Sequence, residues 1–199
     1  MASCCTPAWP VTSPDGNLRR SCLQVFDGAK VSDKILIIEM LLDRANNIII
    51  GGGMAYTFLK ARGGKIGSSL CEDDRMELAL ELLEKAKAKG VNIHLPIDSI
   101  IADKFAADAQ TELANNSAIP DGWMGLDIGA EACKAFSEVI TRSKTILWNG
   151  PMGVFEMEKF QNGTKTIAES VVAATAQGAF SLVGGGDSVS AVNQFGFND

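Results

Sequence analysis

Histidine is almost missing from this sequence, since His94 is the only one among 199 residues. It lies in the short apolar stretch of residues 91–95, without a surrounding set of nucleophilic or metal-ligating residues. Histidine is the side chain that most readily exchanges a proton near neutral pH. A mechanism built on histidine is therefore disfavoured, and a structural role is predicted for His94.

Cysteine is present but lacks the usual paired arrangements. The five cysteines are odd in number and include no C-x-x-C pair. Disulfide frameworks and zinc sites normally show such pairing. Neither is predicted, and a reducing compartment fits best, so a cytoplasmic protein is expected, with an organellar form left open.

Positive charge and long apolar runs are also lacking. Lysine and arginine number 18 against 24 acidic residues, which gives a formal net charge of −6. Without a basic excess, neither a nucleic acid nor an anionic membrane is an expected partner. No stretch approaches the roughly 18 apolar residues of a membrane span. Any phosphate ligand must therefore be held by local groups.

What is present is a composition with 46% hydrophobic residues, enough for a buried core. Residues 1–27 contain three prolines and no sustained periodicity, so an irregular leader is expected, with little regular structure before Phe26. A targeting segment and an incorrectly joined coding sequence are both open explanations. Residues 28–199 are predicted to form one lobe.

Strands alternate with helices along this lobe. Strands are predicted at residues 48–50, 93–95, 99–102, 145–148 and 179–183; helices are predicted from a cap at Ser32 to about Asn46, at 54–60, 73–89, 130–142 and 164–175, and from about residue 187. In the helix predicted at residues 73–89, the apolar stripe includes Ala79 and Leu80. Such alternation predicts an α/β fold, with a parallel sheet covered by helices on both faces in three Rossmann-like layers.

Three predicted strands end in turns of small residues, at 51–53, 149–153 and 184–186. Glycine lets the backbone approach a phosphate, and a following helix offers unpaired N–H groups. The three turns together indicate a nucleotide site, although tight turns alone would also explain each of them. Neither the G-x-G-x-x-G pattern nor the P-loop pattern is present.

Charged candidates accompany these turns. Lys30 and Lys34 are four residues apart, which would place them on one helical face, either to clamp a polyphosphate or as an exposed basic edge. Asp187 follows three glycines and could cap a helix or coordinate Mg²⁺.

Six stretches in chain order resemble one family. They are G-A-K-V-S-D-K at 28–34, I-I-G-G-G-M-A-Y-T-F-L-K at 49–60, A-D-K-F at 102–105, I-P-D-G-W-M-G-L-D-I-G at 119–129, W-N-G-P-M-G-V-F-E at 148–156 and G-G-G-D-S at 184–188. On these motifs the sequence resembles the phosphoglycerate kinases. The resemblance implies the glycolytic transfer of a phosphoryl group between 1,3-bisphosphoglycerate and ADP. It also implies that this chain corresponds to the C-terminal lobe of a phosphoglycerate kinase, the lobe that binds the nucleotide with Mg²⁺.

The resemblance implies roles for single residues. Lys30 and Lys34 would be catalytic, with Lys30 neutralising the moving phosphoryl group and Lys34 contacting the nucleotide phosphates. Asp187 would hold Mg²⁺, and Glu156 would accept hydrogen bonds from the ribose. The implied residues that bind ADP or ATP are Gly28, Ala29, Lys30, Asp33, Lys34, Gly52, Gly53, Phe105, Gly125, Leu126, Asn149, Gly150, Met152, Phe155, Glu156, Gly185, Gly186, Asp187 and Ser188.

The chain departs from the family pattern at both ends. The lobe that binds phosphoglycerate is absent, so that substrate would bind only if a complementary lobe is present. Asp27 stands where the first glycine of a G-G-A-K turn belongs, and the sequence stops at Asp199, before a further S-T-G-G-G-A segment. An incomplete lobe, a monomer and an inactive isolated chain are expected. The alternative is a non-catalytic adenine-nucleotide-binding fragment or pseudo-enzyme.

Overall fold

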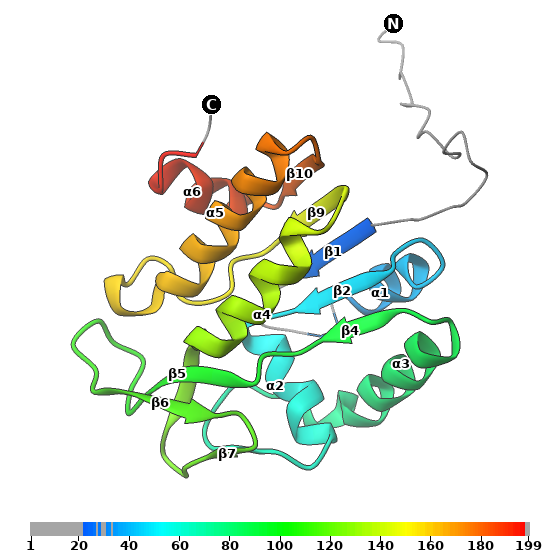
Figure 1. The fold of residues 1–199 in the computed structure, drawn as a ribbon. Helices are drawn as coiled ribbons and strands as arrows, with labels where there is room; N and C mark the ends of the chain where they lie inside the picture. Colours follow the sequence, from blue (N-terminus) through cyan, green and yellow to red (C-terminus); the bar gives the residue numbers. More distant parts are fainter. Residues whose placement is uncertain (1–21, 27, 29–30, 33, 198–199) are drawn as a thin grey trace, which may run out of the picture.

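A computed structural model describes residues 22–26, 28, 31–32 and 34–197 (Figure 1). Its strands are β1 (Cys22–Phe26), β2 (Asn47–Ile50), β3 (Lys65–Ile66), β4 (Asn92–His94), β5 (Asp98–Ala102), β6 (Thr111–Asn115), β7 (Ala118–Ile119), β8 (Met124–Ile128), β9 (Thr145–Asn149) and β10 (Phe180–Gly184). Its α-helices are α1 (Ile35–Leu41), α2 (Gly52–Ala61), α3 (Met76–Ala88), α4 (Ala130–Thr141), α5 (Asn162–Ala176) and α6 (Gly186–Gln194). Two short 3-10 helices, Asp73–Arg75 and Glu158–Phe160, precede α3 and α5.

The main sheet has five parallel strands in the order β10-β9-β1-β2-β4. Its central strand, β1, corrects the expectation of little regular structure before Phe26. Leu23 and Val25 are fully buried, and β1 pairs with β2 on one side and β9 on the other. Gln24 interrupts the apolar run, which explains why the sequence pattern concealed a strand that long-range pairing stabilises. Residues 1–21 and Asp27 lie outside the described residues.

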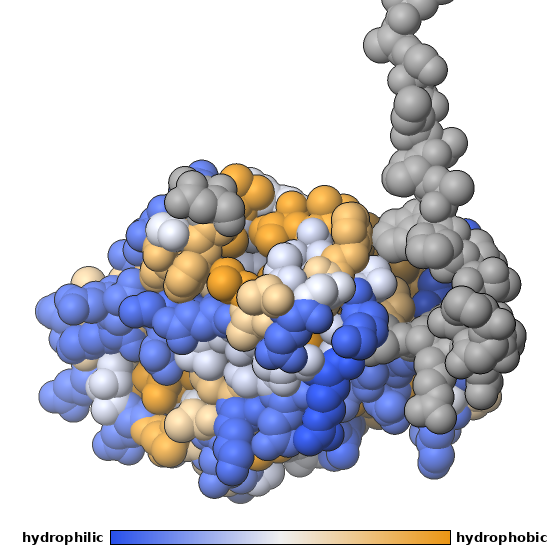
Figure 2. All heavy atoms as spheres, turned by 45° about the horizontal axis from the view of Figure 1, so that its top comes forward, coloured by the Kyte–Doolittle hydropathy of each residue, from blue (hydrophilic) through white to orange (hydrophobic). Residues whose placement is uncertain are grey.

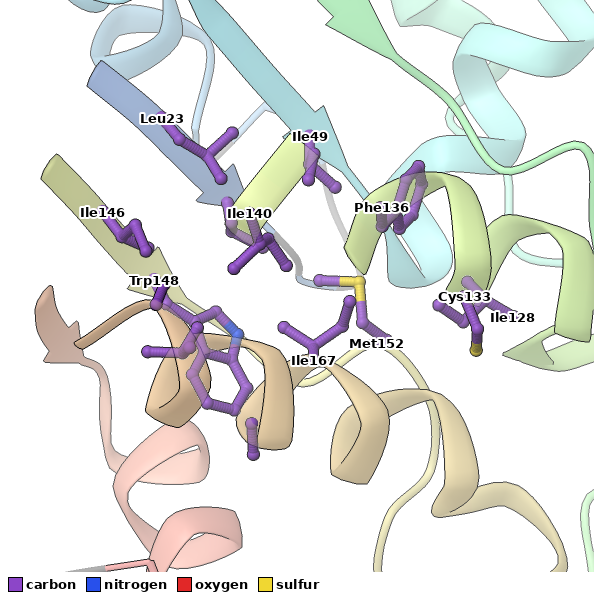
Figure 3. Packing of buried hydrophobic residues seen from close by; sticks show 14 of the residues in the cluster. Leu23, Ile49, Ile128, Cys133, Phe136, Ile140, Ile146, Trp148, Met152 and Ile167 are labelled. Atoms are coloured by element: carbon purple, nitrogen blue, oxygen red, sulfur yellow. The ribbon is translucent and has the colours of Figure 1, made fainter. Parts of the chain in front are cut away.

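Helices cover both faces of this sheet, as predicted. Side chains of a strand point alternately to opposite faces, so Ile49 enters one core and its neighbours Ile48 and Ile50 enter the other. Figure 3 shows the first core, where Ile49 and Trp148 from the strands lie with Ile140 from α4. The second core packs the sheet against α1, α2 and α3. The three-layer α/β arrangement is confirmed.

A smaller antiparallel sheet, in the order β6-β5-β8, was not predicted. The strand expected at residues 99–102 is present as β5, but it belongs to this second sheet rather than to the parallel one. Both of its neighbours lack a clear strand pattern, since β6 is mostly exposed and β8 contains Gly125 and Asp127. A pair of two-residue strands, β3 and β7, lies beside them.

The predicted helices are present, with shifted boundaries and two local corrections. Ser32 does not cap α1; the helix begins after Lys34, and the Ser32 hydroxyl donates to Glu72 instead. On α3, Leu80 is exposed and Leu82 is buried, which is the reverse of the expected stripe at these positions. His94 contacts Asn47 at 3.0 Å, and burial lowers the pKa of its ring, which supports the predicted structural role.

The surface is polar over much of the face in Figure 2, with hydrophobic patches between hydrophilic areas. Exposed apolar side chains include Phe180 and Leu182 on the edge strand β10. Within the part of the chain that the structure describes, no helix has the length and apolar character needed to cross a membrane.

Candidate functional site

The carboxyl ends of the parallel strands lie level with one another. Phe26 at the end of β1 pairs with Ile50 of β2 and with Asn149 of β9, and Asn149 pairs with Gly184 of β10. The turns that follow these strands therefore leave the sheet along one edge. The convergence predicted from the glycine-rich turns is confirmed, and this edge is where open parallel sheets bind ligands.

Glycine is required by the backbone at two of these turns. Gly52, the first residue of α2, has φ 56°, and Gly185, immediately before α6, has φ 88°. Both values fall in the left-handed region that side chains with a Cβ rarely adopt. The glycines therefore shape the turns sterically, and each turn leads directly into the start of a helix.

A cavity of about 540 Å³ opens at this edge. The residues proposed from the sequence that line it are Gly28, Gly52, Gly53, Phe105, Gly125, Leu126, Met152 and Asp187. Sequence reasoning missed the other lining residues, which are Tyr56, Ser68, Leu70, Pro96, Met124, Asp127, Ile128, Pro151, Gly153 and Val154. The cavity thus lies between the parallel sheet edge and the antiparallel sheet, with mostly apolar walls and few charged groups.

Other predicted site residues do not line the cavity. They are Lys34, Asn149, Gly150, Phe155, Glu156, Gly185, Gly186 and Ser188. Phe155 is buried and Glu156 is exposed. Ala29, Lys30 and Asp33 are outside the described residues. Lys34 lies immediately before α1, which begins at Ile35, and the helical face expected to be shared by Lys30 and Lys34 stays a prediction.

Lys34 is held against the end of β9. Its Nζ donates to Asn149 Oδ1 at 2.8 Å, and its side chain passes beside Gly28, which lines the cavity. A lysine ammonium group can donate three hydrogen bonds. The contact with Asn149 therefore orients this cation close to the cavity while leaving capacity for a ligand oxygen.

The loop after β9, residues 150–154, is held by hydrogen bonds at its first residue. The Gly150 amide donates to Ser188 Oγ at 2.6 Å, and the Trp148 indole donates to the Gly150 carbonyl at 2.6 Å. Ser188 is fully buried, so its hydroxyl holds this loop to α6. Asp187 beside it is exposed and makes no capping bond, so the alternative role of helix cap is not borne out.

Tyr56 forms part of the wall next to the antiparallel sheet. Its hydroxyl is 2.8 Å from Ser99 Oγ, and the ring occupies the space that a Cβ on Gly125 would need. The Gly125 amide in turn donates to Ser69 Oγ at 2.9 Å. One signal pointed to this residue: Tyr56 is the only tyrosine, and it lies one helical turn after the glycine turn at Gly52 and Gly53.

Glu72 anchors the segment that precedes α1. Its carboxylate accepts from the Ser32 amide at 3.0 Å and from the Ser32 hydroxyl at 2.7 Å. Partial burial alone would raise the pKa of Glu72, but the hydrogen bonds from Ser32 and from the Val31 backbone outweigh it and lower the pKa. The ionised carboxylate therefore ties residues 31 and 32 to the loop before α3.

Replacing Glu72 with glutamine should destabilise the fold by about 1 kcal/mol, because the amide nitrogen cannot accept the second Ser32 bond. Urea unfolding at neutral pH would measure the loss. Ser32→Ala is the matched partner. The double variant should lose less unfolding free energy than the two single variants lose together, because both substitutions remove the same contact. Full additivity would contradict the anchoring role.

Comparison with known proteins decides the family. The profile described as "Phosphoglycerate kinase" matches residues 13–199. The chain belongs to the phosphoglycerate kinase family. The match begins inside the segment that was predicted to be an irregular leader, in keeping with the strand β1 found there.

Relatives agree with this assignment. The phosphoglycerate kinase of Porphyromonas gingivalis is 53% identical over 183 residues, which cover 92% of this chain and 44% of that protein. A solved structure of phosphoglycerate kinase from Coxiella burnetii superimposes with a TM-score of 0.87 at 40% identity, covering 92% of this chain and 46% of that one. The chain thus spans a little under half the length of these family members.

The names of the relatives place them in different cellular compartments. Two from Arabidopsis thaliana, named cytosolic phosphoglycerate kinase 3 and chloroplastic phosphoglycerate kinase 2, are 50% and 51% identical to this chain. Family membership by itself therefore does not select a compartment.

Proposed function

We propose that this chain supplies the Mg-ADP/ATP-binding lobe for phosphoglycerate-kinase-type phosphoryl transfer between 1,3-bisphosphoglycerate and ADP, a step of glycolysis. The observation that carries the proposal is the cavity at the level carboxyl ends of the parallel strands, lined by Gly52, Gly53 and Asp187. It combines close backbone approach, helix N-termini and a carboxylate in one place, as a metal-bound polyphosphate requires.

The residues present fit a magnesium ion. Asp187 lines the cavity in the first turn of α6, and its carboxylate is exposed. Among the described residues, no group of three or more His, Cys, Asp or Glu could hold a metal by itself. Mg²⁺ is commonly bound by one or two carboxylates together with substrate phosphates. Asp187 would hold the ion, which when bound neutralises charge on the phosphate oxygens.

The chain's own contribution to transfer would be positioning and positive charge. Phosphoryl transfer asks for an in-line arrangement and for cations around the moving group. Lys34, oriented by Asn149, would contact the phosphates from beside Gly28. Lys30 would neutralise the transferred group, and Phe105 and Leu126 would contribute apolar surface for the base.

Turnover is expected to need a complementary lobe, because the chain covers only 44% of its relative from Porphyromonas gingivalis. The chain alone should show no activity above background in a coupled assay with Mg-ATP and 3-phosphoglycerate. Turnover by the isolated chain would overturn this part of the proposal. Nucleotide binding without turnover, both by the chain alone and with a complementary lobe added, would favour the alternative, a non-catalytic nucleotide-binding protein. We further propose a cytoplasmic monomer.

Calorimetric titration of the purified chain with Mg-ADP tests the proposal. The wild-type chain should show a heat of binding that fits a single site. Lys34→Ala should weaken binding about tenfold through loss of a charge-assisted contact. Lys87→Ala is the control, because Lys87 lies in the last turn of α3 and does not line the cavity. Absence of heat at millimolar nucleotide, or equal weakening in both variants, would contradict the proposal.

A further inference from the structure

A buried carboxylate forms part of the cavity wall. Asp127, in β8, is 2% exposed and lines the cavity. Burial raises the pKa of its carboxyl to about 7, against the opposing effect of backbone hydrogen bonds from Gly163 and Ile128. Two other titratable groups share this region: Cys133 of α4, whose pKa burial and the charges of Asp127 and Asp98 raise to about 12, and Asp98 itself.

Asp127 joins β8 to the start of α5. Its Oδ2 accepts from the Gly163 amide at 2.7 Å, in the first turn of α5, and its Oδ1 accepts from the Ile128 amide at 2.9 Å. Both Gly163 and Gly153 lie so close that a Cβ on either would collide with the carboxylate. The carboxylate therefore fills the space between the helix, the strand and the loop after β9.

That loop is fixed to the same two elements. Thr164 Oγ1, in the first turn of α5, accepts from the Met152 amide at 3.0 Å and from the Gly153 amide at 3.3 Å. The Val154 amide donates to the Leu126 carbonyl of β8 at 2.9 Å. Met152, Gly153 and Val154 all line the cavity. The position of this wall thus depends on where α5 starts relative to β8.

We propose that Asp127 is a positioning residue for the nucleotide, whose carboxylate clamps α5 to β8 and so sets the cavity wall formed by the loop after β9. The inference rests on the proposed function, since it concerns the same cavity. It assigns the residue no contact with the reacting atoms.

Asp127→Asn in the full chain tests the proposal by calorimetry with Mg-ADP. Asparagine has nearly the same shape but only one accepting atom, so one of the two amides loses its partner. The Kd should rise about tenfold. Asp98→Asn is the matched control: Asp98 is also buried and accepts from the Glu131 and Ala132 amides at the start of α4, but it does not line the cavity. Its Kd should stay within about twofold of wild type.

The outcomes distinguish a failure of the proposed function from a failure of the positioning role of Asp127. No heat with wild-type chain would remove the proposed function and this inference together. Binding by wild type with an unchanged Kd in Asp127→Asn would remove only the positioning role. If Asp127→Asn fails to fold, Gly163→Ala displaces the same carboxylate without changing its charge, and it should raise the Kd similarly; an unchanged Kd there counts against the proposal.

Discussion

Trp148→Ala should destabilise the chain by about 3–5 kcal/mol, the largest loss expected from a single substitution here. Trp148 is fully buried in β9, within the core between the sheet and helices α4 and α5. Its truncation opens a large cavity and removes the indole donor that holds the Gly150 carbonyl at 2.6 Å. Guanidinium unfolding followed by circular dichroism would measure the change.

The neighbouring strand provides a matched control. Leu182 on β10 is 50% exposed, so Leu182→Ala should cost well under about 1 kcal/mol. Trp148→Phe retains much of the packing and loses the hydrogen bond, so its cost should lie between the other two. Similar losses for Trp148→Ala and Leu182→Ala would mean that the core is not packed as Figure 3 shows.

The free energy of unfolding should increase as pH falls from about 8 towards about 6.5, because of Asp127. Its pKa is raised from 3.8 to about 7 in the folded chain, so over this window the folded state takes up a proton as pH falls while the unfolded state stays ionised. The slope for one group cannot exceed about 1.4 kcal/mol per pH unit. The contribution is fully present below the unfolded pKa and is lost as pH rises through about 7.

Asp127→Asn should remove this dependence, and the difference between the two profiles isolates the residue. His94 acts in the opposite direction at lower pH: burial lowers the pKa of its ring from 6.5, so the unfolded chain protonates first and stability falls. Urea midpoints between about pH 6.5 and 8 therefore give the cleanest comparison. Parallel profiles for wild type and variant would show that Asp127 does not titrate as expected.

The parallel half of the fold was predictable because its signals are local. Short β-branched runs such as residues 48–50, followed by glycines and amphipathic helices, specify strand–turn–helix units wherever they occur. Rules for parallel sheets then place the turns on one edge. The glycine part of the candidate site followed directly, including Gly52 and Gly53.

The missed parts depend on contacts distant in the sequence. Strand β1 carries a buried glutamine, and its identity as the central strand comes from pairing with residues 24 and 123 positions further on, in the registers Leu23 with Asn47 and Gln24 with Leu147. β6 is too exposed to show an alternating pattern. The antiparallel sheet supplies much of the cavity wall, so Tyr56 and Asp127 were not recognised as site residues.

The place of β1 also determines how far the chain can be shortened. A domain started at Gly28, where the first family motif begins, would leave β2 and β9 separated by an empty strand position. Adjacent strands lie about 4.8 Å apart, so this gap is twice the distance that backbone hydrogen bonding spans. The two halves of the sheet would each present an unpaired edge to solvent, and any recombinant form meant to fold must keep the residues from Cys22 onward.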